Sequence, residues 1–195
     1  MNEPRYRIEW NDGRALLVAS EADPEEVERQ ARTLSGWYND DYNRGMMDHT
    51  CLMTPQDVVD HFHASQAQGG RVFLLYHDGE LMGDGDFRGI TCRAAEFAIM
   101  IGARTAQGKG LGTRFTTLLH AFAFRELKVL TASLTIVPKN VPGRRCYEKV
   151  GYAVDGSAEA RAYADHDDDI AMSLPRDEFE RRHGEILDQI RISKV

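Results

Sequence analysis

Short hydrophobic stretches alternate with turn residues along the first half of the chain. Residues 5–10 and 14–19 lie on either side of an Asn-Asp-Gly turn, which predicts a β-hairpin. Further hydrophobic stretches predict strands at residues 71–77, 80–88 and 94–101. Because only short polar segments separate these last three strands, we expect them to pair as an antiparallel meander.

Hydrophobic residues spaced three or four apart predict helices between and after these strands. Residues 24–34 and 54–68 form two of them, and each begins with a capping residue or a proline. Residues 36–51 between them indicate a loop with a short helix. A third helix begins after residue 110 and ends near residue 128, with apolar side chains at Leu111, Phe115, Leu118, Leu119, Phe122 and Leu127.

The last third of the chain adds strands and two more helices. Strands are expected at residues 130–137, 152–155 and 170–174, with a short helix at 140–150. Residues 175–195 predict an amphipathic helix that begins at a proline. Because a strand, a helix and a second strand follow one another in mid-chain, we expect an α/β fold. Its sheet is mixed and mostly antiparallel, flanked by helices, with one central strand-helix-strand crossover.

The strongest chemical signal is a glycine-rich turn between a predicted strand and a predicted helix. Its sequence is QGKGLG, from Gln107 to Gly112. Glycines lack Cβ atoms, so backbone N–H groups can close around a phosphate where the helix dipole is positive. The turn therefore predicts an anion site.

Two common phosphate-binding loops do not fit this turn. A nucleoside-triphosphate loop needs glycine where Ala103 stands and a hydroxyl residue where Gly110 stands. A dinucleotide fingerprint needs a further glycine where Thr113 stands. Neither class of nucleotide is indicated.

The turn instead resembles the Q/R-x-x-G-x-G pyrophosphate loop of the GCN5-related N-acetyltransferase (GNAT) superfamily, with Gln107, Gly110 and Gly112 in register. The superfamily's second motif, N-x-x-A-x-x-x-Y-x-x-x-G-[FY], is similar to the segment that begins at Asn140 and contains Tyr147. Two motifs in the right order make a chance match improbable. The resemblance covers about residues 70 to 175.

One position departs from the second motif. Gly143, preceded by Pro142, stands where the superfamily usually has alanine. Both residues suit a first helical turn, so we expect a slightly altered helix start and no loss of function.

The resemblance implies an acetyl-CoA-dependent N-acetyltransferase in which a primary amine attacks directly in a ternary complex. The strand before the turn would pair with the pantetheine amides, and the turn would hold the pyrophosphate. Two turn residues have simpler alternatives, Lys109 as a solvated side chain and Gln107 as a cap of the turn. The implied acetyl-CoA-binding residues are Ile99, Met100, Ile101, Gln107, Gly108, Lys109, Gly110, Leu111, Gly112, Thr113, Asn140 and Tyr147.

Residues 1–195 would then form a single N-acetyltransferase domain, a size that can bury a substantial core. Residues 1–70 would supply amino-terminal strands and acceptor-side helices. Residues 70–175 would form the acetyl-CoA-binding core, and residues 175–195 the carboxy-terminal helix.

Two catalytic roles follow from the resemblance. Tyr147 matches the family's general acid, and a phenol with a pKa near 10 can protonate a thiolate without being ionised at rest. A half-buried tyrosine with a satisfied hydroxyl is the alternative. Asn140 suits either a helix N-cap or a hydrogen-bond partner of the cofactor, and these roles are compatible.

Glu96 is expected to be the general base, because many family members have a catalytic glutamate on this strand. The local alternation does not decide whether Glu96 faces inward or faces solvent. Asp84 and Asp86 share one face of the preceding strand. They are alternative bases, or carboxylates that bind an ammonium group.

The acceptor is expected to be a small-molecule amine, an amino sugar or a protein amino terminus. Substrate-binding candidates are Trp37, Tyr38, Asp84 and Asp86, since aromatic rings beside carboxylates suit a cationic amine. Two other functions remain open. One is a non-catalytic acyl-CoA-binding or sensing module, and the other is an acyltransferase that uses a longer acyl-CoA.

Charge and cysteine content limit the expected binding partners and cellular compartment. A formal net charge of −7 disfavours nucleic acid as a partner. Three cysteines without a C-x-x-C pair suit a reducing compartment, and no apolar run suggests export or membrane insertion. We therefore expect a cytoplasmic protein with no membrane association, and a homodimer remains open.

No metal site is expected. The pairs His49-x-Cys51 and His61-x-His63 lie in the amino-terminal half, but residues two apart on a helix face different ways, so His61 and His63 cannot both bind one ion. Residues 165–169 resemble a calcium loop only in composition. Cys146 suggests a covalent acetyl intermediate, but no histidine is placed by sequence to activate it, so a packing role is preferred.

Overall fold

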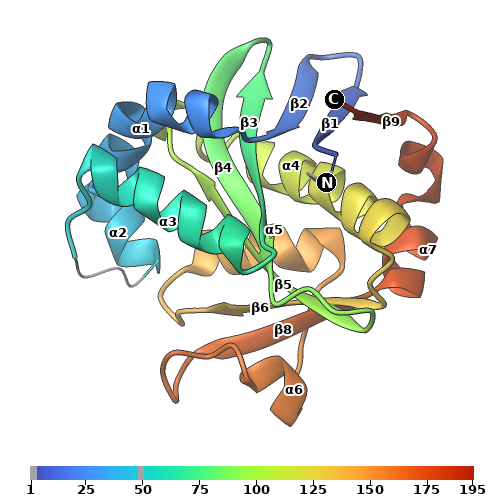
Figure 1. The fold of residues 1–195 in the computed structure, drawn as a ribbon. Helices are drawn as coiled ribbons and strands as arrows, with labels where there is room; N and C mark the ends of the chain where they lie inside the picture. Colours follow the sequence, from blue (N-terminus) through green and yellow to red (C-terminus); the bar gives the residue numbers. More distant parts are fainter. Residues whose placement is uncertain (1–3, 48–50) are drawn as a thin grey trace.

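A computed structural model describes residues 4–47 and 51–195. The strands form one sheet with the order β7-β8-β6-β5-β4-β3-β2-β1-β9 (Figure 1). All its neighbouring pairs are antiparallel except β5 and β6, which are parallel. The strands are β1 (Tyr6–Asn11), β2 (Leu16–Glu21), β3 (Arg71–His77), β4 (Glu80–Arg88), β5 (Ala94–Ile101), β6 (Thr131–Ile136), β7 (Ala153–Val154), β8 (Ile170–Pro175) and β9 (Ile190–Lys194).

Helices cover both faces of this sheet (Figure 1). Helices α1 (Pro24–Tyr38) and α3 (Pro55–Ala67) pack together on one face, and α4 (Leu111–Phe122) lies on the other. Helix α4 connects β5 to β6 and is the predicted crossover, so the expected fold class is confirmed. The remaining helices are α2 (Asp41–Met47), α5 (Val141–Val150), α6 (Ala158–Arg161) and α7 (Arg176–Leu187), with a 3₁₀ turn at Arg104–Ala106 and a π turn at Ala123–Leu127.

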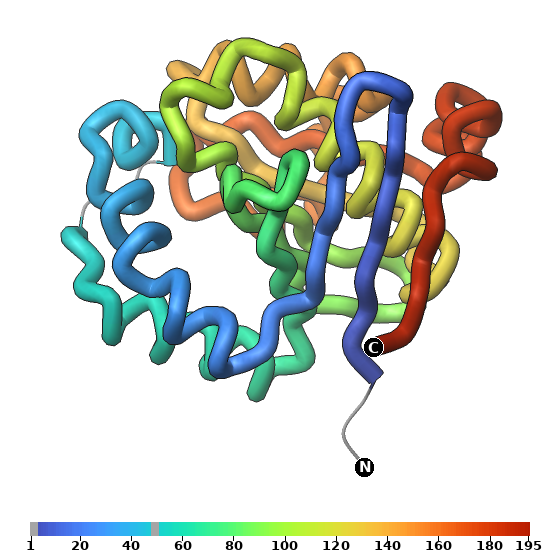
Figure 2. Tube along the Cα trace, turned by 90° about the horizontal axis from the view of Figure 1, so that it is seen from above, coloured from blue at the N-terminus to red at the C-terminus, as the bar shows by residue number. Residues whose placement is uncertain are grey.

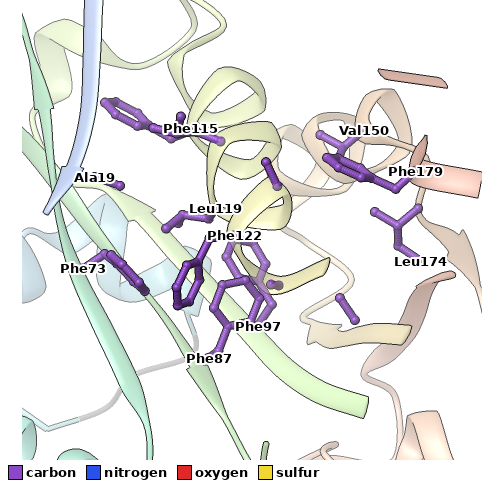
Figure 3. Close-up of a cluster of buried hydrophobic side chains, with 14 of the residues drawn as sticks. Ala19, Phe73, Phe87, Phe97, Phe115, Leu119, Phe122, Val150, Leu174 and Phe179 are labelled. Carbon is purple, nitrogen blue, oxygen red and sulfur yellow. The ribbon is translucent and has the colours of Figure 1, made fainter. Parts of the chain in front are cut away.

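Alternating side chains of β3 explain why both faces are covered. Phe73 is fully buried against α4, whereas its neighbour Leu74 packs with α1 and α3. On the α4 side, Phe122 meets Phe73 edge to face at 5.0 Å between ring centroids. Figure 3 shows these rings together with Phe97 from β5. A strand with two apolar faces needs helices on both sides.

Strands β5 and β6 separate part-way along their length. They pair only from Ala94 to Glu96 on β5 and from Thr131 to Ser133 on β6. Strand β5 continues to Ile101 and β6 to Ile136. The unpaired backbone N–H and C=O groups beyond this fork are free to bind another extended group.

The carboxy-terminal prediction needs a correction. The helix expected over residues 175–195 ends at Leu187, and β9 follows as an edge strand antiparallel to β1. Figure 2 shows this last strand beside the first. The short alternation Ile190, Arg191, Ile192 gives only a weak local strand signal, and its partner β1 lies at the other end of the chain. Within the described ranges, no helix is long and apolar enough to cross a membrane.

Candidate functional site

A cavity of about 590 Å³ opens at the fork between β5 and β6. Residues 97–100 of β5 and 135–137 at the end of β6 form part of its wall. Tyr147 of α5 enters the lining, as do Tyr38 of α1 and His61 of α3 on the face away from α4. The fork therefore joins elements from both faces of the sheet in one cavity.

The glycine turn leads into α4, which begins at Leu111, and none of the turn's residues is part of the lining of this cavity. Gly108 and Gly110 have φ values of +71° and +79°, which L side chains rarely adopt, and the space around each is open. Gly110 is the N-cap residue of α4, and no side chain caps this helix end. The first N–H groups of α4 are therefore available to an anion.

Gly112 has a different role from the other two glycines. A Cβ atom at this position would lie 3.3 Å from Cys146 Sγ, so Gly112 permits close packing of α4 against α5. The Thr113 hydroxyl donates to Cys146 Sγ at 3.5 Å, and burial raises the pKa of this thiol. The preferred packing role of Cys146 agrees with these contacts.

Gln107 caps the turn from inside. Its amide donates to the Ile101 carbonyl oxygen at 2.7 Å and to Asn43 Oδ1 at 2.8 Å. Asn43 is 3% exposed, and its own amide donates to the carbonyl oxygens of Trp37 and Gly102. Sequence reasoning missed Asn43, since a lone asparagine in a short helix gives no motif.

Tyr147 is buried and lines the cavity. Its hydroxyl has no hydrogen-bond partner among the described residues, and its ring packs against Tyr152 with centroids 5.6 Å apart. Burial, followed by the neighbouring Cys146 and Asp86, raises the pKa of the Tyr147 phenol. The hydroxyl therefore stays protonated and can donate into the cavity.

Asn140 is the N-cap of α5. Its Oδ1 accepts the Gly143 N–H at 2.9 Å, and its amide donates to the Met46 carbonyl oxygen at 3.0 Å. A Cβ atom on Gly143 would lie 2.7 Å from that Oδ1. This contact gives a physical reason for glycine where the superfamily usually has alanine. Asn140 also lines the cavity, so the two roles weighed for it remain compatible.

Three carboxylates face the cavity from β4 and β5. The Tyr38 hydroxyl donates to Asp84 Oδ2 at 2.5 Å. Burial raises the pKa of Asp84 to about 7, against the opposing effect of that hydrogen bond, and the charge of Asp86 adds to the rise. Glu96 also lines the cavity, which answers the question of its orientation.

Arg88 is shared between two of these carboxylates. Its Nη2 donates to Glu96 Oε1 at 2.9 Å. Its Nε lies 3.1 Å from Asp86 Oδ1, but neither atom makes an aligned hydrogen bond. Burial raises the pKa of both Glu96 and Asp86, and the Arg88 charge opposes the rise. Each carboxylate is thus more basic than its ordinary form.

The predicted site residues are only partly brought together. Trp37 is outside the cavity lining as described, and its ring would lie 2.2 Å from a Cβ atom on Gly102. Of the predicted acetyl-CoA contacts, Ile99, Met100, Asn140 and Tyr147 line the cavity, and the glycine turn and Ile101 do not. The lining also contains Met46 and Thr135, which the sequence did not single out, and His61, Asp165 and His166, which the sequence analysis considered as possible metal ligands.

Histidines do not gather into a metal cluster in the part of the chain that the structure describes. Across residues 4–47 and 51–195, no group of three or more His, Cys, Asp or Glu side chains is placed to hold a metal ion. In the sequence pair His49-x-Cys51, His49 lies outside the described residues.

Comparison with models of known protein families identifies the family of this chain. The model of the acetyltransferase (GNAT) domain matches residues 7–153. Because this match covers most of the chain, the chain belongs to the GNAT acetyltransferase family, as the two motifs predicted. A search by sequence among curated proteins gives no match.

Solved structures share the fold at low sequence identity. The aminoglycoside acetyltransferase AAC(6')-Ib in complex with coenzyme A matches with a TM-score of 0.71 and 19% identity, over 85% of this chain and 98% of that one. Mycobacterium smegmatis RimJ in complex with CoA-disulfide gives 0.74 and 14%, over 97% of both chains. Spermidine N-acetyltransferase from Vibrio cholerae in complex with CoA and spermine gives 0.70 and 17%, over 84% and 97% respectively.

Proposed function

We propose that the protein is an N-acetyltransferase that moves an acetyl group from acetyl-CoA to a primary amine by direct attack in a ternary complex. One observation carries the proposal. The Tyr147 hydroxyl, which has no hydrogen-bond partner among the described residues, shares the cavity at the β5–β6 fork with three carboxylates of raised pKa. An unpartnered acid beside several bases suits a reaction that both removes and delivers a proton.

Acetyl-CoA fits the groups that the fork leaves open. The unpaired edge of β5 offers backbone N–H and C=O groups for the pantetheine amides, as an added strand would use them. The uncapped start of α4 offers N–H groups for the pyrophosphate, and Gly108 and Gly110 keep its approach free of Cβ atoms. Lys109 extends from the same turn as a further cation for a phosphate.

Glu96 is the proposed general base. It lies at the last paired position of β5, next to the fork, and its raised pKa favours acceptance of a proton from an ammonium group. Its contact with Arg88 makes it less basic than burial alone would. Asp84, with a pKa of about 7, is the second candidate.

Tyr147 is the proposed general acid. When the tetrahedral intermediate collapses, the carbon–sulfur bond breaks and the leaving sulfur needs a proton. The Tyr147 phenol is protonated at neutral pH and faces the cavity, so it can supply that proton. We also propose a cytoplasmic location, in keeping with the absence of a disulfide among Cys51, Cys92 and Cys146.

A screen of amines tests the proposal. Purified protein is mixed with acetyl-CoA and amino sugars, polyamines, simple amines or peptides, and thiol release is followed together with the product mass. Acetylated amine with one equivalent of released CoA is expected. CoA binding without turnover of any amine would indicate a sensing module, and turnover only with longer acyl-CoA would indicate a different acyl donor.

A further inference from the structure

The cavity at the β5–β6 fork carries an excess of carboxylates. Its described lining contains Arg88 and no other Lys or Arg side chain. The carboxylate of Asp169 is hydrogen-bonded within its own loop. Its Oδ2 accepts hydrogen bonds from the backbone N–H groups of residues 165 and 166 at 3.2 and 3.1 Å. The carboxylates of the lining are Asp84, Asp86, Glu96, Asp165 and Asp169.

Arg88 forms an ion pair with one of the two carboxylates on β4, Asp86, without an aligned hydrogen bond, and no such pair with Asp84 is found among the described residues. Its hydrogen bond goes to Glu96, and its nearest atom to Asp86 is not aligned for one. Asp84 accepts from the neutral Tyr38 hydroxyl on one oxygen. Oδ1 of Asp84 and Oδ1 of Asp86 are buried, and neither has a hydrogen-bond partner among the described residues. Such oxygens favour a ligand that donates hydrogen bonds to them.

We propose that the acceptor is a di- or polycationic amine, with its reacting nitrogen at Glu96 and a second ammonium group at Asp84 and Asp86. This inference rests on the proposed function, because it identifies the substrate class of the same cavity. An ammonium group has three donors and a positive charge, so at Asp84 and Asp86 it would offset the lost hydration of these carboxylates. A monoamine held at Glu96 supplies no second charge there.

Strand geometry gives the spacing of the two cationic groups. Glu96 stands opposite Arg88 in the β4–β5 pair, and Asp86 and Asp84 lie two and four residues from Arg88 along β4. At about 3.3 Å per residue, Asp86 and Asp84 lie roughly 7 and 13 Å along the strand from the position opposite Glu96. A flexible aliphatic diamine or a longer polyamine spans such distances.

Three probes with the same five-carbon chain isolate the second charge. Cadaverine has an ammonium group at each end, aminopentanol has a hydroxyl in place of the second ammonium group, and pentylamine has no second polar group. Their dissociation constants are measured by calorimetry, with and without CoA. Cadaverine should bind at least about tenfold more tightly than the other two, a difference of about 1.4 kcal/mol. Added salt should reduce the preference.

Two substitutions locate the second ammonium group. Asp86→Asn and Asp84→Asn, made separately, should each lower the affinity for cadaverine about tenfold, and by much more than the affinity for pentylamine. Asp168→Asn removes an exposed carboxylate outside the cavity lining and should change neither. Melting temperatures show which variants are folded, and two independent positions keep the test decisive if one variant is unstable.

The outcomes separate this inference from the proposed function. Equal affinities of wild-type protein for cadaverine and aminopentanol would overturn the inference, even if both amines were acetylated. A clear cadaverine preference that Asp86→Asn removes would support it. If that preference were found and no amine were acetylated in the screen, the dicationic site would stand and the proposed acetyl transfer would be contradicted.

Discussion

Gln107 and Asn43 are hydrogen-bonded at 2.8 Å, although 64 residues separate them in the sequence. The bond joins the glycine turn to helix α2. Because Gln107 also donates to the Ile101 carbonyl oxygen, its amide fixes the turn relative to the end of β5. The start of α4 is thereby held in place before any ligand binds.

Asn43→Ala should raise the KM for acetyl-CoA about five- to tenfold, because the turn loses its anchor. It should also lower the free energy of unfolding by roughly 1–3 kcal/mol, since buried groups lose partners. Asn39→Ala is the matched control. Asn39 exchanges two hydrogen bonds with the Met53 backbone and does not touch the turn. An equal change in the KM for acetyl-CoA in both variants would contradict the prediction that Asn43 anchors the turn.

Gly110→Val should abolish the rise in melting temperature that CoA gives the wild-type protein. Ligand that binds only the native state stabilises it, and a β-branched residue at φ +79° distorts the turn that is proposed to bind the pyrophosphate. Gly69→Val controls for strain, because Gly69 has the same φ and the same open surroundings at a distant turn. A CoA shift that survives in Gly110→Val would place the pyrophosphate elsewhere.

Glu96→Gln should lose most activity at neutral pH and recover it at alkaline pH, where the free amine needs no base. Burial raises the pKa of Glu96, so wild-type activity should fall as pH decreases through a value above that of an ordinary glutamate. Rate profiles of both proteins against pH check this. Full activity of the variant at neutral pH would contradict Glu96 as the general base. Asp84 would then be the next candidate, and Asp84→Asn would be measured.

Asp84→Asn should be more stable than wild type above pH 7. The folded-state pKa of Asp84 is raised to about 7 by burial, so the folded state binds more protons than the unfolded state between pH 3.8 and 7. Wild-type stability therefore falls as pH rises through that window. The variant lacks this loss, a difference of roughly 2–4 kcal/mol. Denaturant unfolding at pH 4 and pH 8 measures it, and Asp168→Asn should follow wild type.

Local patterns predicted most of the fold. The strands at residues 71–77, 80–88 and 94–101 have the bounds that their hydrophobic patterns indicated. Strand β9 was wrongly assigned to a helix, because its stability comes from pairing with β1 and its own alternation is short. Sequence patterns report local periodicity, and a strand at the sheet edge depends on a distant partner.

Some residues of the candidate site could likewise be predicted from the sequence, and others could not. Tyr147, Asn140 and the glycine turn have motif spacing that the sequence displays directly. Asn43 and Arg88 act through contacts that only the fold creates, across β4, β5 and α2. The alternation around Glu96 could not decide its face, because the strand is apolar on both sides. Trp37 was grouped with its neighbour Tyr38, although adjacent helical residues point about 100° apart.

Tyr152 provides a matched control for the proposed general acid. The Thr116 carbonyl oxygen lies 2.7 Å from His120 Nδ1 and can only accept, so that nitrogen carries the hydrogen. The Tyr152 hydroxyl then donates to His120 Nε2 at 2.7 Å. Tyr152→Phe removes this buried bond and should lower stability by about 1 kcal/mol with near-normal turnover.

Single-turnover kinetics of Tyr147→Phe test the central claim most directly. The change removes one hydroxyl and keeps the ring that packs on Tyr152. If Tyr147 protonates the leaving thiolate, kcat should fall about 10²- to 10⁴-fold. The affinity for acetyl-CoA should fall by no more than the roughly 0.5–1.5 kcal/mol of one hydrogen bond. An unchanged kcat, with weaker acetyl-CoA binding or lower stability instead, would contradict the role of Tyr147 as the acid.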